Sequence, residues 1–144
     1  MINLIKLSVG TVSIHSLLEW QKMSRANNLR DFGVAEHWHT TRMRPKREAE
    51  LLDGGSIYWV FKGIIQCRQK ITRLDEVTGG DGIRRCRIVL DKNLHATATW
   101  PKRPFQGWRY LKAPDAPPDV AMPSKSDVNM PQELRNALFE LGLL

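Results

Sequence analysis

Cysteine is scarce in this sequence, and long apolar runs are missing. The 144 residues include two cysteines, Cys67 and Cys86, both inside strand-like apolar patterns, so we expect free buried thiols and no disulfide framework. No stretch approaches the roughly 18 apolar residues of a membrane span. The first ten residues lack the apolar core and cleavage site of a secretory signal. These absences predict a cytoplasmic protein that does not associate with membranes.

The common catalytic signatures are missing as well. No GxSxG elbow, Walker loop, HExxH motif or paired-cysteine zinc spacing occurs. His37 and His39 share one face of a predicted strand, but the sequence offers no third ligand for a metal. We therefore predict no metal site, no cofactor and no catalytic residue, and an enzyme is the less favoured interpretation.

Apolar residues at a spacing of two predict an α+β fold rich in strands. The clearest strand begins after a Gly-Gly turn, where Ile57, Trp59 and Phe61 point to one side. Ser13 can cap a helix over residues 13–30, with Ile14, Leu17, Leu18 and Leu29 on one face. The sequence shows no regular alternation of strands and helices, so a parallel Rossmann-type sheet is not expected. Further strands are expected at residues 2–9, 37–43, 64–74, 85–90, 95–100 and 105–111, a short helix at 45–52 starting at Pro45, a bulge or sharp bend at Gly63, and a hairpin loop at 78–82.

The composition divides the chain into three segments. Residues 1–112 carry the strand pattern and are expected to form the folded domain, a small, partly open β-barrel of about five to seven strands with flanking helices. Residues 113–130 contain four prolines and no aromatic residue, which is typical of an extended connector. Residues 131–144 predict a C-terminal helix with an apolar stripe that docks on the domain. The alternative is that this helix binds a partner or a second copy of the chain.

Positive charge and tryptophan are concentrated in one part of the chain. Residues 42–112 hold sixteen lysines and arginines against seven acidic residues, a local excess of nine, whereas the whole chain carries +7. Four of the five tryptophans lie within residues 38–108. A polyanion that carries flat rings, namely nucleic acid, suits such a surface, although a solvated basic face remains the alternative.

The basic and aromatic residues supply candidate binding sites. Arginine forks pair two phosphate oxygens at once, and an indole or phenol ring stacks on a base. Trp59 is expected in the core. The predicted phosphate ligands are Arg42, Arg44, Lys46, Arg47, Lys102, Arg103 and Arg109, and the predicted base-stacking residues are Trp38, Trp108 and Tyr110.

The order of elements between residues 38 and 73 resembles the PUA-like superfamily, the small β-barrels that include PUA, ASCH and EVE domains. An arginine-bearing strand is followed by a short helix, the turn LLDGG, the strand SIYWV, a glycine and the strand IIQCRQKI. The resemblance implies a barrel with a ligand cleft. Some ASCH proteins are small amidohydrolases, but the nearest residue types here, Thr41, Lys46 and Glu50, do not match their order and spacing.

The whole chain is also similar to an alphaproteobacterial family, the domain of unknown function 1489. The strings that carry this similarity are LIKL and VG near the start, TRM and PKR, ELLDGGS and YWV, EVTG, DGIRRCR and FQGWRYL. The similarity brings no activity with it.

The sequence therefore predicts a nucleic-acid-binding module, with RNA favoured over DNA and a modified or unpaired base in an aromatic, basic cleft. A small ASCH-like hydrolase of modified nucleosides is one alternative. A protein-binding assembly factor that uses the C-terminal helix is another. We expect a monomer.

Overall fold

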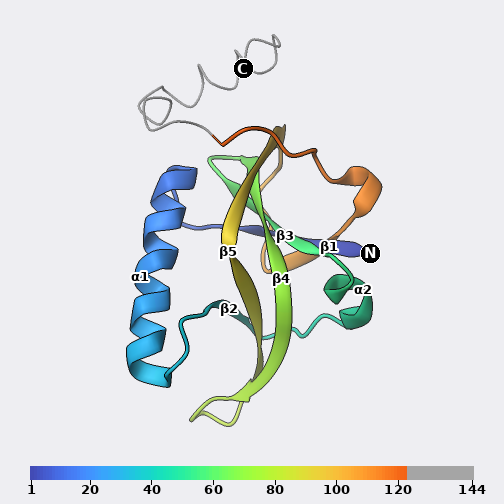
Figure 1. Cartoon of the computed structure of the whole chain (residues 1–144). Helices are drawn as coiled ribbons and strands as arrows, with labels where there is room; N and C mark the ends of the chain where they lie inside the picture. The colour runs from blue at the N-terminus through green and yellow to red at the C-terminus, as the bar shows by residue number, and fades with distance from the viewer. Residues whose placement is uncertain (123–144) are drawn as a thin grey trace.

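The computed structural model describes residues 1–122 and shows one mixed sheet of six strands with two α-helices (Figure 1). The sheet is not closed, and its strand order is β2-β5-β4-β3-β1-β6. β1 pairs with β3 in parallel, and the other neighbouring strands are antiparallel. The elements are β1 (Ile2–Leu7), α1 (Ile14–Phe32), β2 (His37–Thr41), α2 (Glu48–Leu52), β3 (Ser56–Phe61), β4 (Ile64–Thr78), β5 (Arg84–Pro101), β6 (Trp108–Lys112) and the 3-10 turn η1 (Ala113–Asp115).

Two long strands, β4 and β5, form the spine of the sheet. β2 pairs with the first half of β5, and β3 pairs with the first half of β4 (Figure 1). Because β4 and β5 are antiparallel, β2 and β3 lie at opposite ends of this spine. The pairing of β4 with β5 shifts register at three places. Because such irregularities bend a strand and increase its twist, the sheet curls and its edge strands β2 and β6 approach each other. The indole Nε1 of Trp108 in β6 donates to the carbonyl of Met43, just beyond β2, at 2.9 Å.

Apolar side chains form a separate cluster on each face of the curled sheet. The larger cluster includes Leu4, Ile57 and Trp59, with Trp108 and Tyr110 packed against it. The smaller cluster is built around the alternate residues of the same strands, such as Ile5. Every residue of β3 is buried, and its side chains from Ile57 to Phe61 alternate between the two clusters.

Helix α1 begins after the cap residue Ser13, as predicted. The Ser13 hydroxyl accepts from the backbone N–H of Ser16, the Ser16 hydroxyl accepts from that of Ser13, and both distances are 3.0 Å. The predicted apolar face is wrong at its end, since Leu29 is 53% exposed. Gln21 lies in the buried face instead, because its amide pairs with Gln69 of β4.

Three local predictions need correction. The short helix begins at Glu48 and not at Pro45, which is buried in the core. Gly63 lies in the tight turn between β3 and β4, where it and Lys62 both have positive φ, so the sharp bend is correct and the bulge is not. The two strands expected at 85–90 and 95–100 form one strand, β5.

The predicted connector is described only in its first part, residues 113–122. There the Ala98 N–H donates to the Pro118 carbonyl at 2.8 Å, and the Val120 N–H donates to the Ala96 carbonyl at 2.9 Å. Asp119 also accepts two hydrogen bonds of 2.7 Å from the Arg68 guanidinium. This part of the chain therefore runs along β5. The rest of the connector and the predicted helix at 131–144 lie outside the described residues.

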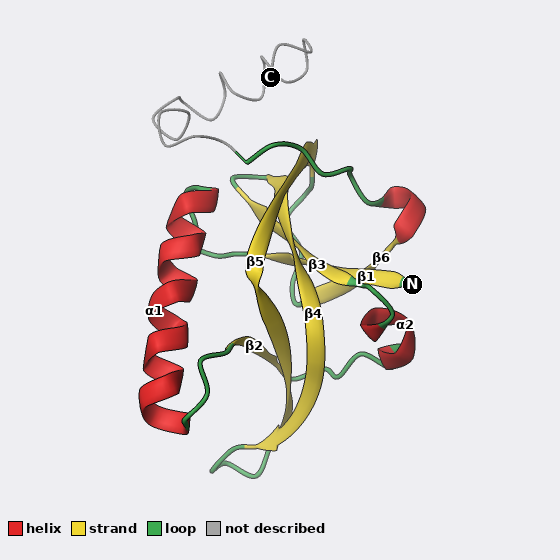
Figure 2. Cartoon of the chain, viewed as in Figure 1, coloured by secondary structure: helices red, strands yellow, loops and turns green. Residues whose placement is uncertain are grey.

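In Figure 2, α1 and α2 stand on opposite sides of the sheet. Within residues 1–122, no helix combines the length and apolar character that crossing a bilayer requires. One side of α1 faces the curled sheet near the C-terminal end of β1.

Candidate functional site

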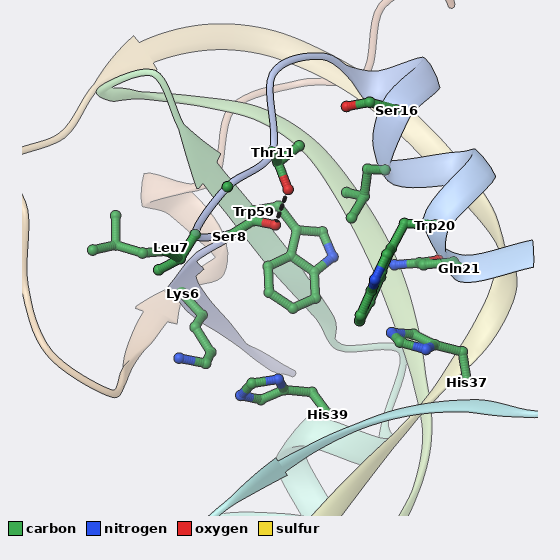
Figure 3. A pocket seen from close by; sticks show the side chains of 13 residues that line it. Lys6, Leu7, Ser8, Thr11, Ser16, Trp20, Gln21, His37, His39 and Trp59 are labelled. Atoms are coloured by element: carbon green, nitrogen blue, oxygen red, sulfur yellow. Dashed lines mark hydrogen bonds between the residues drawn. The ribbon is translucent and has the colours of Figure 1, made fainter. Parts of the chain in front are cut away.

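A cavity of about 530 Å³ lies where α1 faces the curled sheet. Its walls come from the end of β1 and the loop that follows, the first half of α1, strand β2 and Trp59 of β3 (Figure 3). Its size falls within the range of about 300–1,000 Å³ that is typical of small-molecule sites. The cavity is therefore a candidate site.

Two histidines of β2 project into this cavity. Residues two apart on a strand share a face, so His37 and His39 point the same way. The His37 ring lies edge-on to Trp20 at 5.1 Å, and its Nδ1 lies 2.9 Å from the Ser24 hydroxyl. The His39 ring lies edge-on to Trp59 at 6.0 Å. Each imidazole therefore has a fixed aromatic neighbour.

Both imidazoles are neutral at pH 7. Burial, with smaller contributions from the nearby His39 and Arg25, lowers the pKa of His37 from 6.5 to about 4. Burial and the positive charge of Lys6 lower the pKa of His39 to about 4 as well. A neutral imidazole has one donor and one acceptor nitrogen, so the pair can recognise both kinds of group on a ligand.

Lys6 supplies the cationic group of the cavity. It lies across from His39 (Figure 3), and partial burial lowers the pKa of its amine. Among the described residues, the amine makes no ion pair, and no aspartate or glutamate lines the cavity. The positive charge of Lys6 therefore favours an anion at the end of the cavity where Lys6 and His39 lie.

A buried pair of side-chain amides joins α1 to β4 beside the cavity. Gln21 of α1 and Gln69 of β4 exchange two hydrogen bonds of 2.9 and 2.7 Å. The Gln69 carbonyl oxygen also accepts from the Trp59 indole N–H at 3.2 Å. Since Gln21, Gln69 and Trp59 are all buried, this network holds the helix and the sheet at a fixed separation.

The open side of the cavity carries hydroxyl groups and an exposed ring. Ser8 and Thr11, in the loop after β1, lie with their hydroxyl oxygens 2.5 Å apart. Trp20 lines the cavity and is nevertheless 59% exposed. A large apolar ring at the border of a pocket is a surface on which a flat ligand can stack.

Four of the predicted phosphate ligands lie together on the loop between β2 and α2. The backbone N–H groups of Lys46 and Arg47 both donate to the Tyr110 hydroxyl, at 2.9 and 3.1 Å. The Arg44 and Arg47 guanidiniums pair with Glu48 and Glu50, and these groups are exposed. This basic loop, residues 42–47, is therefore attached to β6.

The basic loop and the cavity are neighbours through β1 and β6. Lys6 is paired with Trp108 across these strands and with Trp59 across β1 and β3, so the three side chains share one face of the sheet. Trp108 in turn contacts the basic loop through Met43. Trp108 therefore links the basic loop to Lys6 in the wall of the cavity.

The predicted base-stacking residues have structural roles and do not frame one site. The rings of Trp108 and Tyr110 meet edge to face at 4.9 Å, and their polar groups hold the basic loop. Trp38 lies on the face of β2 opposite the two histidines, with the Arg87 guanidinium 4.5 Å from its ring and Phe32 at 5.5 Å. The structure therefore separates Trp38 from the other two.

The remaining predicted phosphate ligands also lie apart from the basic loop. Arg109 projects to the opposite face of β6, with its guanidinium 5.3 Å from the Phe105 ring. Lys102 and Arg103 follow β5, near the turn at Gly63, whose carbonyl accepts from the Lys102 N–H at 2.9 Å. The predicted cationic surface is thus divided among three places.

The cysteines are free and buried as expected. Burial raises the pKa of both thiols, which disfavours the reactive thiolate. Within residues 1–122, no group of three His, Cys, Asp or Glu side chains is placed to hold a metal ion. Glu50, one of the residue types considered for a hydrolase, is an exposed partner of Arg47.

Because His37 and His39 are buried in the neutral form, we expect the free energy of unfolding to fall when the pH is lowered. In the unfolded chain each imidazole regains a pKa of 6.5, so below that pH the unfolded state binds protons that the folded state does not bind. Stability should be complete above about pH 6.5 and should fall toward pH 4. We expect a loss of about 1 kcal/mol per histidine at about pH 5.5, measured by urea unfolding.

The matched variant for this measurement is His39→Gln, which should remove about half of the pH sensitivity between about pH 7.5 and 5.5. A free energy of unfolding that stays constant over this interval in the unsubstituted protein would contradict the buried, neutral state of the pair.

Sequence reasoning placed His37 and His39 on one strand face but assigned them no role, and it did not place them in a cavity. Lys6 and Trp20 carry no motif, and the buried Gln21–Gln69 pair joins positions 48 residues apart. One usable signal was present: Trp20 departs from the apolar face of its helix, which is unusual for a large aromatic residue in a covered helix.

One comparison with known proteins gives a match. Residues 4–144 match the family described as "Protein of unknown function (DUF1489)". No curated protein and no solved structure matches the chain significantly.

Proposed function

The chain belongs to the DUF1489 family of proteins of unknown function, and we propose that it binds single-stranded nucleic acid, with RNA favoured over DNA. One unpaired base would enter the cavity between α1 and β2, and the flanking phosphates would contact the basic loop at 42–47. The observation that supports this proposal is the adjacency of an aromatic cavity and a cationic loop on one face of the sheet.

The cavity offers what an unpaired base needs. The exposed Trp20 ring provides a stacking surface, which contributes about 1–3 kcal/mol per base in comparable proteins. The neutral His37, beside Trp20, and the Ser8 and Thr11 hydroxyls provide donors and acceptors for the base edge. Single-stranded RNA presents such edges readily, because its bases are not engaged in a duplex.

The basic loop offers the phosphate contacts. Arg42 and Lys46 are exposed, and the pairs of Arg44 with Glu48 and of Arg47 with Glu50 are on the surface, where ion pairs contribute little. The arginines can therefore exchange their carboxylate partners for phosphates. In this proposal Trp108 and Tyr110 position the loop and do not stack on the base.

The proposal retains the PUA-like barrel as the fold family, since a ligand cleft in the gap of a partly open barrel accords with that resemblance. It also retains a monomeric, cytoplasmic protein that returns its ligand unchanged. Lys102 and Arg103 would extend the phosphate path, whereas Arg109 and Trp38 lie on other surfaces and have no role in it.

The salt dependence of RNA binding tests the proposal. We expect a labelled single-stranded RNA of about 12 nucleotides to bind at low salt, because this length suits a small single-strand site. If four phosphates are contacted, the affinity should fall roughly fiftyfold between about 50 and 200 mM KCl. Fluorescence anisotropy measures both values. Absence of binding at the lower salt, or an affinity that does not change with salt, would refute the proposal.

A pair of variants on α1 shows whether the base enters the cavity. Trp20→Ala should weaken RNA binding about tenfold through loss of stacking. Met23→Ala is the matched control, since Met23 is 65% exposed on the same helix and does not line the cavity. Equal effects of the two substitutions would place the base elsewhere. The alternative function, a hydrolase, is tested by incubating the protein with modified nucleosides and detecting hydrolysed products by mass spectrometry.

A further inference from the structure

Two polar groups at one end of the cavity lack partners among residues 1–122. The Lys6 amine and the His39 imidazole lie near each other, as the effect of Lys6 on the pKa of His39 requires (Figure 3). Neither ring nitrogen of His39 makes a hydrogen bond to the described residues, and neither is sealed from the cavity, since the one buried unpartnered side-chain atom of residues 1–122 belongs to Arg25. His37 differs, because its Nδ1 is paired with Ser24.

The surroundings of these two groups are positive or neutral. The titratable and charged groups that face His39 are Lys6 from β1 and His37 from its own strand, and Arg25 of α1 acts on His37. No acidic side chain lines the cavity. A half-buried ammonium without a counter-ion is unfavourable, so an anion that reached this place would be stabilised by it.

The two ends of the cavity therefore differ in chemistry. Trp20, at one end, presents a ring to the opening, and Lys6 and His39 lie at the other end beside Trp59 (Figure 3). A ligand that matches both ends carries a flat ring and an anionic group, separated by a short spacer. A nucleotide has this form, since its ribose joins the base to the phosphate.

We propose that Lys6 and His39 form an anion subsite that binds the phosphate of the nucleotide whose base stacks on Trp20. This inference rests on the proposed function, because it takes the base from there and adds the phosphate. Lys6 donates from its ammonium to one phosphate oxygen, and His39 donates from one ring nitrogen to another. The cavity is then a nucleoside monophosphate site, and the basic loop serves the neighbouring nucleotides.

Titration of the full chain with nucleoside 5′-monophosphates, the corresponding nucleosides and inorganic phosphate tests the subsite. Tryptophan fluorescence reports binding, because Trp20 and Trp59 line the cavity. We expect the monophosphates to bind at least about tenfold more tightly than the nucleosides, as charge-assisted hydrogen bonds are lost with the phosphate. Inorganic phosphate alone should bind weakly.

Two lysine variants localise the effect. Lys6→Met should abolish the preference for monophosphates, so that monophosphates and nucleosides bind to this variant with equal affinity. Lys70→Met is the matched control, since Lys70 is exposed on β4 and does not line the cavity. His39→Gln keeps one donor and should lose less than Lys6→Met. Circular dichroism checks that each variant is folded.

The outcomes separate the subsite from the proposed function. Equal affinities for nucleosides and monophosphates would overturn the subsite but leave base binding intact. RNA binding without binding of any mononucleotide would do the same. Monophosphate binding that depends on Lys6, in a chain that does not bind RNA, would support the subsite and overturn the proposed function. An equal loss in Lys6→Met and Lys70→Met would overturn the subsite.

Discussion

Replacing Gly55 with alanine should destabilise the fold by about 3 kcal/mol or more, the upper range for overpacked sites. Gly55 lies between α2 and β3, and a Cβ atom there would stand 2.3 Å from the Ile2 carbonyl oxygen and 2.4 Å from that of Leu51. Both obstacles are backbone atoms. The Leu51 carbonyl also accepts from the Gly55 N–H at 2.8 Å, so it cannot shift without breaking this hydrogen bond between α2 and the start of β3.

Urea unfolding of Gly55→Ala and of the control Gly80→Ala measures this effect. Gly80 lies in the loop between β4 and β5, where an added Cβ meets nothing within 4 Å. Its substitution should change the free energy of unfolding by less than about 0.5 kcal/mol. If the two variants were equally stable, the close approach of β1, α2 and β3 at Gly55 would be wrong.

Gln69→Leu should destabilise the protein by about 3–5 kcal/mol, because it leaves several buried groups without partners. The Gln69 amide donates to the Gln21 side chain at 2.7 Å and to the Asp91 carbonyl at 2.6 Å. Its oxygen accepts from Gln21 and from the Trp59 indole. Leucine has a similar size and makes none of these bonds, so the change isolates the polar network from the packing.

The control for this substitution is Gln106→Leu, at an exposed position between β5 and β6, which should be nearly neutral. The double variant Gln21→Leu with Gln69→Leu should be less destabilised than the sum of the two single variants, since no amide is then left facing an apolar side chain. Thermal and urea unfolding give these values. Additive losses would show that the two amides are not coupled.

The strands could be predicted from the sequence because their signals are local. The alternation around Trp59, the cap at Ser13 and the glycine-rich loop at 78–82 each depend on neighbouring residues, and the structure confirms all three. The continuity of β5 and the curl of the sheet were not predicted. They depend on register shifts between β4 and β5, which arise from tertiary pairing and leave no mark in hydrophobic periodicity.

The candidate site shows the same division. The basic loop was visible as a run of arginine and lysine, but its neighbours were not. Lys6, Trp20 and His39 come from three different elements, and only the curled sheet with α1 beside it brings them to one cavity. Trp38, at a one-residue offset from His37 and His39, lies on the other face of β2, away from the cavity.

The position of β1 between β3 and β6 has a consequence for the order in which the chain can assemble. β1 is the first strand to be synthesised, but its two partners begin at Ser56 and Trp108. During translation it has no partner on one edge until almost the whole described chain has emerged, and such long-range pairing is slow. Every residue that lines the cavity precedes Gly63, so all of its walls have been synthesised well before β6 can cover the second edge of β1.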